Sequence, residues 1–85
     1  MTSKDQEWVA AKLAKFVDVS KPLGEVLDIL TLQAHAEMCR WCGKRVTLAK
    51  LRQRLHEEIV AGNMGTAGKV ASAAAAVLGR IVNKG

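Results

Sequence analysis

Aromatic residues and proline are scarce in this sequence. Its 85 residues include two tryptophans, one phenylalanine, one proline and no tyrosine. Hydrophobic residues still make up 49% of the chain, which excludes a disordered tail. A core must therefore be built mostly from leucine, valine, isoleucine and alanine. The length predicts one domain over residues 1–85. Because a chain this short buries only ~60% of its unfolded surface, we expect it to gain further burial as a homodimer.

Long uncharged apolar runs are also missing, which predicts no membrane-spanning helix and no membrane partner. The nearest case, "MGTAGKVASAAAAVLGRIV", is interrupted by Lys69 and Arg80. The first residues, "MTSKDQEW", are polar and lack the apolar core of a secretory signal. The two cysteines lie three residues apart and cannot form a disulfide framework. We therefore expect a cytoplasmic protein.

Acidic residues are absent from residues 38–56, where six cations give a charge of +6. The flanking segments carry −2 over residues 1–37 and +1 over residues 57–85. A basic block beside a mildly acidic half favours a surface that faces a polyanion, and a solvated helix face is the alternative. The six cations are Arg40, Lys44, Arg45, Lys50, Arg52 and Arg54.

Strand-like alternation and internal repeats are not found, whereas apolar residues recur at helical spacing. The pattern predicts an all-α fold, a compact bundle of about four helices that contains a helix-turn-helix. The expected helices span residues 4–17, 21–42, 47–61 and 66–82. Their expected N-caps are Ser3 (in a capping box with Gln6), Ser20 (before Pro22), Thr47 and Thr66.

The expected inward faces follow from the same spacing. They comprise Val9, Leu13, Phe16 and Val17 in the first helix, Leu48, Leu51, Leu55 and Ile59 in the third, and Val70, Ala71, Ala74, Val77, Leu78 and Ile81 in the last.

The second helix has two apolar stripes on roughly opposite sides, so it is either central in its domain or shared with a partner chain. One stripe contains Leu23, Val26, Leu27, Leu30, Ala34, Met38 and Trp41, and the other contains Ile29, Leu32, Ala36 and Cys39.

The segment "CRWC" is a C-x-x-C pair, for which three interpretations compete. A thioredoxin-like redox motif needs a βαβ setting, which this sequence lacks. A zinc site would require His35, Cys39, Cys42 and His56 to converge, but no second pair of ligands follows at the usual spacing. We favour two buried, inert cysteines and two partly exposed histidines, and we expect no metal and no cofactor. No catalytic motif stands out, so we do not expect an enzyme.

The basic block spans a helix, a short turn and the first two turns of another helix. The outward face of residues 47–61 should carry Lys50, Gln53, Arg54 and Glu57, with Arg52 near the apolar edge. In a helix-turn-helix, the N-terminal part of the second helix enters the major groove, and the turn holds the phosphates. Arginine reads guanine and glutamine reads adenine. The expected DNA-binding residues are Lys44, Arg45, Thr47, Lys50, Gln53 and Arg54.

The stretch "RVTLAKLRQRL" resembles a helix of small helix-turn-helix repressors from plasmids and phages, of the KorC-like kind. Length, basicity and the all-helical pattern are similar, although Cys39 stands where the motif usually has alanine. The resemblance implies a homodimeric transcriptional repressor that binds a palindromic operator.

Two alternatives remain open. In a second register the last helix reads DNA through Thr66, Lys69, Ser72 and Arg80. In the second functional hypothesis, the chain is a small phage or plasmid interaction module that sets its basic face against an acidic protein. The last helix also has a strip of small residues, which serves either a dimer interface or a tight contact within the chain. The strip consists of Gly68, Ser72, Ala75, Ala76 and Gly79.

Overall fold

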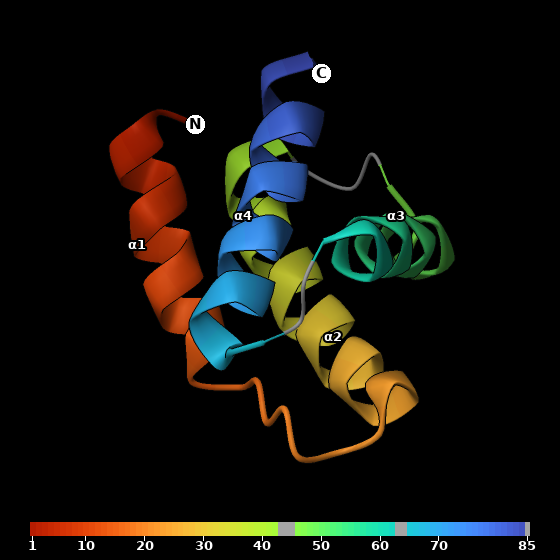
Figure 1. Cartoon of the computed structure of the whole chain (residues 1–85). Helices are drawn as coiled ribbons and strands as arrows, with labels where there is room; N and C mark the ends of the chain where they lie inside the picture. The colour runs from red at the N-terminus through yellow and green to blue at the C-terminus, as the bar shows by residue number, and fades with distance from the viewer. Residues whose placement is uncertain (43–45, 63–64, 85) are drawn as a thin grey trace.

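Four helices account for most of the residues that the computed structural model describes, which are 1–42, 46–62 and 65–84 (Figure 1). The described residues contain no strand, which confirms the all-α prediction. Observed and expected helix ends differ by three residues or fewer. The helices are α1 (Ser3–Ala14), α2 (Leu23–Cys42), α3 (Leu48–Ala61) and α4 (Ala67–Lys84).

Two of the four predicted N-caps are wrong. The N-cap of α1 is Thr2, whose Oγ1 accepts from the Asp5 backbone N–H at 3.2 Å, while Asp5 Oδ2 accepts from the Thr2 N–H at 2.8 Å. The carboxylate of Asp5 closes this capping box one residue earlier than Gln6 would have done. Ser20 does not cap α2, because its N–H and hydroxyl both donate to Asp18 Oδ1, at 3.0 and 2.5 Å.

The caps of the last two helices are as predicted. Thr47 Oγ1 accepts from the Lys50 N–H, and Thr66 Oγ1 accepts from the Lys69 N–H, each at 3.2 Å. The segment predicted to end the third helix does so at Gly62, whose N–H donates to the Glu58 carbonyl at 3.0 Å. Threonine and glycine therefore fix the bounds of α3, the helix that carries half of the expected DNA contacts.

The core lies around α4, which contacts α1, α2 and α3. Figure 1 shows α1 on one side of α4, α3 on the other and α2 behind it. The fully buried side chains come from all four helices, and most predicted inward positions are among them. Examples are Val9, Leu13, Leu27, Leu30, Met38, Leu51, Leu55, Val70 and Leu78.

Two predicted inward residues, Phe16 and Leu48, are instead exposed, and so is Trp41 of the first apolar stripe of α2. Leu48 and Trp41 lie at ends of their helices, and Phe16 lies just after the end of α1. Helical spacing gives the direction of a side chain, but it does not show how far the neighbouring helices extend. In α2 the first apolar stripe is otherwise inward, and the second stripe faces solvent at Ile29 and Leu32.

The chain buries an ordinary share of its surface without a second copy. Its accessible surface is 5038 Å², and a compact monomer of this mass exposes about 4,900 Å². The core is therefore formed within one chain, and a partner would only bury additional surface outside it. Across the described part of the chain, the helices fall short of the length and apolarity that crossing a membrane requires.

Candidate nucleic-acid interface on α3

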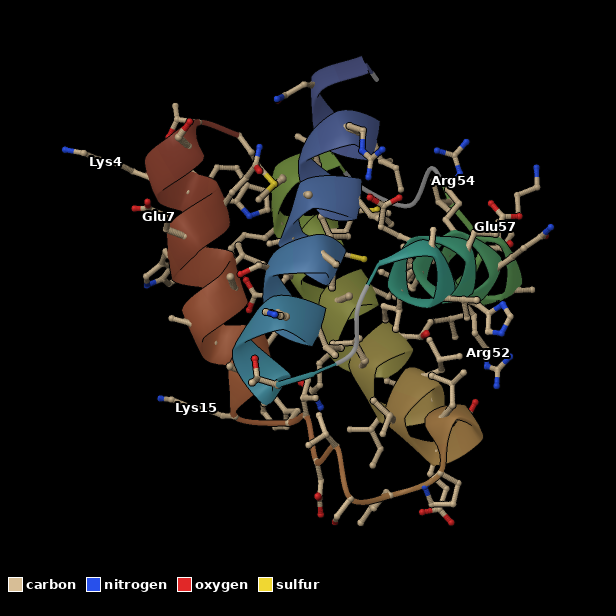
Figure 2. All side chains as sticks on the ribbon, viewed as in Figure 1. Lys4, Glu7, Lys15, Arg52, Arg54 and Glu57 are labelled. Atoms are coloured by element: carbon tan, nitrogen blue, oxygen red, sulfur yellow. The ribbon has the colours of Figure 1, made fainter. Side chains whose placement is uncertain are left out.

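The solvent face of α3 carries the polar residues that were predicted for it. Lys50, Gln53, Arg54 and Glu57 are all exposed, and Figure 2 shows Arg54 and Glu57 on the opposite side of α3 from Arg52. Gln53 Nε2 donates to Glu57 Oε1 at 3.5 Å. The opposite face, with Leu51, Leu55 and Ile59, is buried against the core. This division leaves two cations and one amide facing solvent on a helix whose inner face is fixed by packing.

The N-terminus of α3 is held beside the middle of α2. His35 Nε2 lies 3.0 Å from the carbonyl oxygen of Val46, the residue before the Thr47 cap. This contact places the start of α3 about two turns before the end of α2. The positive end of the α3 dipole, with its exposed N-cap, favours anions at this point. Lys44 and Arg45 precede it in sequence and lie outside the described residues.

The block of cations is divided among several sides of the molecule. Arg52 Nε donates to Asp28 Oδ1 of α2 at 2.9 Å, so this guanidinium is turned toward α2 as the apolar-edge prediction implied. Arg40 lies over the ring of Trp8 in α1, with its guanidinium carbon 5.8 Å from the ring centroid. Of the six cations, Lys50 and Arg54 are the two described residues on the outward face of α3.

A polar groove of about 320 Å³ separates α3 from α4. Arg54, Glu57 and Glu58 line it from α3, and Val77 and Arg80 line it from α4. Arg80 Nη2 lies 2.8 Å from Glu58 Oε1. The groove therefore brings together Arg54, from the register in which α3 reads DNA, and Arg80, from the register in which α4 does. Arg80 is paired with the carboxylate of Glu58.

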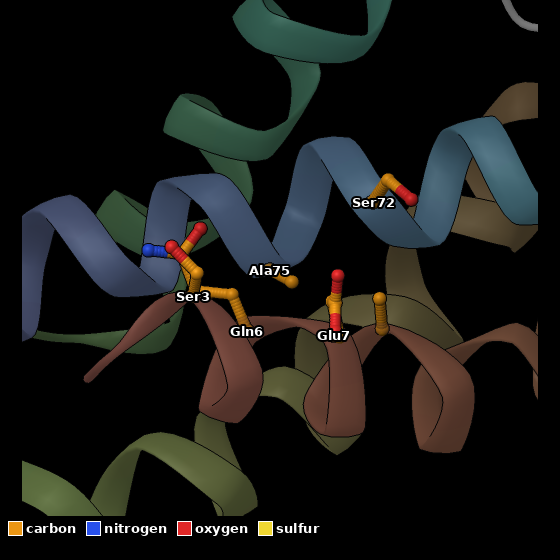
Figure 3. A pocket seen from close by; sticks show the side chains of 6 residues that line it. Ser3, Gln6, Glu7, Ser72 and Ala75 are labelled. Carbon is orange, nitrogen blue, oxygen red and sulfur yellow. The ribbon is translucent and has the colours of Figure 1, made fainter.

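The residues of the second register do not share one face of α4. Ser72 lines a shallow hollow against α1, with Ser3, Gln6 and Glu7 opposite it (Figure 3). Arg80 lines the groove against α3 instead. Because α4 contacts all three other helices, its surface is less accessible to a duplex than that of α3.

The hollow between α1 and α4 has a volume of about 270 Å³. Glu7 is the one ionisable residue among those that line it, beside serine, glutamine and alanine side chains. The lining is otherwise uncharged.

Of the candidate zinc ligands that were set aside, His35 and Cys39 are neighbours, and no third ligand joins them among the described residues. His35 Nδ1 lies 3.9 Å from Cys39 Sγ, whereas its other ring nitrogen contacts the Val46 carbonyl. His56 is exposed on α3. Within the described residues, no three histidine, cysteine, aspartate or glutamate side chains are grouped to hold a metal ion. The side chain of Cys42 lies outside that set. Cys39 is exposed, so its predicted burial is wrong: its side of α2 is open to solvent.

No model of a known protein family matches the chain, and comparisons with curated proteins and with solved structures also give no match.

Proposed function

We propose that this protein is a DNA-binding transcriptional regulator of the repressor type, which contacts duplex DNA through α3 and acts as a homodimer on a palindromic operator. The observation that carries the proposal is the outward face of α3, where Lys50, Gln53 and Arg54 are exposed together on a helix anchored by Leu51 and Leu55. The sequence resemblance to small plasmid and phage repressors supports the same function.

Each residue on this face has a role that suits its chemistry. Lys50 and the capped N-terminus of α3 contact phosphates, because an ammonium and free helix N–H groups attract anions. Gln53 and Arg54 contact base edges, because each forms two parallel hydrogen bonds to one base. Lys44 and Arg45, which precede the helix, supply further phosphate contacts. Glu57 lies one turn further along, where the helix leaves the groove.

The test begins by selecting sites from random duplex DNA and then measures affinities of variants by fluorescence anisotropy. Lys50→Ala should weaken binding to every duplex and reduce the salt slope by about one unit. Arg54→Ala should cost about 1–3 kcal/mol on the selected site and much less on random DNA. Lys4→Ala, an exposed lysine on α1 (Figure 2), is the charge-matched control and should change neither quantity appreciably.

Two results would redirect the proposal. If Lys69→Ala removes site preference while Arg54→Ala does not, α4 is the reading helix. If no duplex binds with salt-dependent affinity, the DNA proposal is wrong. The basic face would then be assigned to an acidic protein partner.

A further inference from the structure

An apolar groove of about 300 Å³ lies between the first half of α2 and the first turn of α3. Leu32 and Leu48 face each other across it and are 58% and 44% exposed. Ile29, one turn before Leu32 on the same helix, is also exposed. Three large aliphatic side chains are therefore open to water in one place, on a chain whose core is otherwise complete. The full lining is Asp28, Thr31, Leu32, Leu48, Ala49 and Arg52.

The groove also contains a buried polar group without a partner. Thr31 lines it, is only 3% exposed, and its Oγ1 has no hydrogen-bond partner in the structure. Buried hydroxyl groups are normally hydrogen-bonded, since leaving one unpaired is costly. The hydroxyl is covered by its own chain, so it is an energetic cost within the wall of the groove and makes no contact with an occupant.

The rim charges favour one kind of occupant. Asp28 and Arg52 flank the apolar residues, and both are solvent-accessible although they pair with each other. One acid and one base can make the surface complementary to itself: with a two-fold axis passing between them, Asp28 of each copy would lie opposite Arg52 of the other. A nucleic acid or a uniformly acidic protein would find no net positive charge on this rim and would leave the leucines unmatched.

The rival dimer surface, the small-residue strip of α4, is partly occupied within the chain. Ala75 is buried, and Gly79 lies against the side chain of Gln6 in α1. This side of α4 therefore serves a contact between helices of one chain. The α2–α3 groove has no such cover among the described residues.

We propose that two copies of this chain associate through the groove, with Leu32 and Leu48 of each copy packed against those of the other, and with Asp28 of one copy paired to Arg52 of the second. The inference rests on the homodimer of the proposed function but not on its DNA contacts. Lys50, Gln53 and Arg54 lie outside the groove, so both surfaces of α3 are available at once.

Sedimentation equilibrium on the full chain, without DNA, tests the apolar part of the proposal. Leu32→Glu should raise the dimer dissociation constant by about tenfold or more, because a buried leucine is replaced by a charge. Val60→Glu is the matched control, since Val60 is 56% exposed on α3 and lies outside the groove. That variant should leave the dimer unchanged, and circular dichroism melts should show both variants folded.

Charge reversal tests the two-fold geometry. Asp28→Arg and Arg52→Asp should each weaken the homodimer, because each places like charges across the axis. An equimolar mixture of the two variants should form a heterodimer at least about tenfold tighter than either homodimer. If the two substitutions acted only by breaking the Asp28–Arg52 pair within one chain, mixing the two variants would not restore tight association.

Three results would overturn the proposal. The wild-type protein could remain monomeric at about 100 μM, which would mean that its self-association is too weak for a specific dimer. The dimer could be insensitive to Leu32→Glu, or the mixture of Asp28→Arg and Arg52→Asp could associate no more tightly than either variant alone. A monomer that still binds its selected duplex would leave the DNA contacts of α3 standing. A groove-dependent dimer without affinity for DNA would leave the groove standing and remove the DNA function.

Discussion

Gly79 of α4 lies directly against the side chain of Gln6 of α1, so close that a Cβ on the glycine would collide with it. The ideal Cβ would come within 2.8 Å of Gln6 Cδ and 3.3 Å of Gln6 Cγ. Glycine in the middle of a helix costs about 1 kcal/mol relative to alanine. The close approach of α1 to α4 explains why this cost is tolerated here.

This contact predicts a coupling between the two positions. Gly79→Ala alone should change the free energy of unfolding little, because the gain in helix propensity is offset by displacement of the Gln6 amide. In a Gln6→Ala background the same change should stabilise by about 1 kcal/mol. Urea unfolding of the four variants should give a coupling energy of about 0.5–1 kcal/mol.

Gly68→Ala supplies the control for this cycle. A Cβ at Gly68 would meet only Thr66 Oγ1, at 3.9 Å, which is an ordinary contact. Its effect should therefore be the same with and without Gln6. If the effects of Gln6→Ala and Gly79→Ala on the free energy of unfolding are additive, the Gln6 side chain does not clash with a Cβ at position 79.

The same pair shows what the sequence could and could not predict. The small-residue strip was evident from spacing, but its partner was not, because a strip of this kind suits a second copy and a neighbouring helix equally well. The outward face of α3 was predictable, since Thr47 marks its start and leucine spacing gives its inner side. The sequence could not predict that Arg40 would contact α1 while Arg52 contacts α2, because this depends on how the helices are arranged in space.

The unpartnered hydroxyl of Thr31 predicts a stabilising substitution. Thr31→Val keeps the shape of the side chain and removes the buried polar atom, so the free energy of unfolding should rise by about 1 kcal/mol. The measurement is made in the Leu32→Glu background, so that association does not contribute. Thr66→Val should act in the opposite direction by about 1 kcal/mol, since Thr66 caps α4. A loss of stability in Thr31→Val would mean that the hydroxyl is satisfied in solution.

The capping box of α1 predicts a local dependence on pH. The Thr2 backbone N–H and then its hydroxyl donate to Asp5, and these hydrogen bonds lower the pKa of that carboxyl below its usual value. Because the folded pKa is depressed, the contribution of Asp5 is fully present above the unfolded pKa of about 3.9 and disappears as pH falls through the folded value. The first turn of α1 should therefore fray in acid.

NMR titration of the aspartate side chains checks this, with a second aspartate as the internal control. The pKa of Asp18 is also lowered, by hydrogen bonds from the Ser20 hydroxyl and N–H. Thr2→Ala should raise the midpoint of Asp5 and leave that of Asp18 unchanged, whereas Ser20→Ala should do the reverse. Asp5→Asn should remove the acid-dependent loss of protection from amide exchange in the first turn of α1, because no carboxylate remains there to be protonated in acid. A midpoint for Asp5 at or above the ordinary aspartate value would show that Thr2 does not donate to the carboxylate in solution.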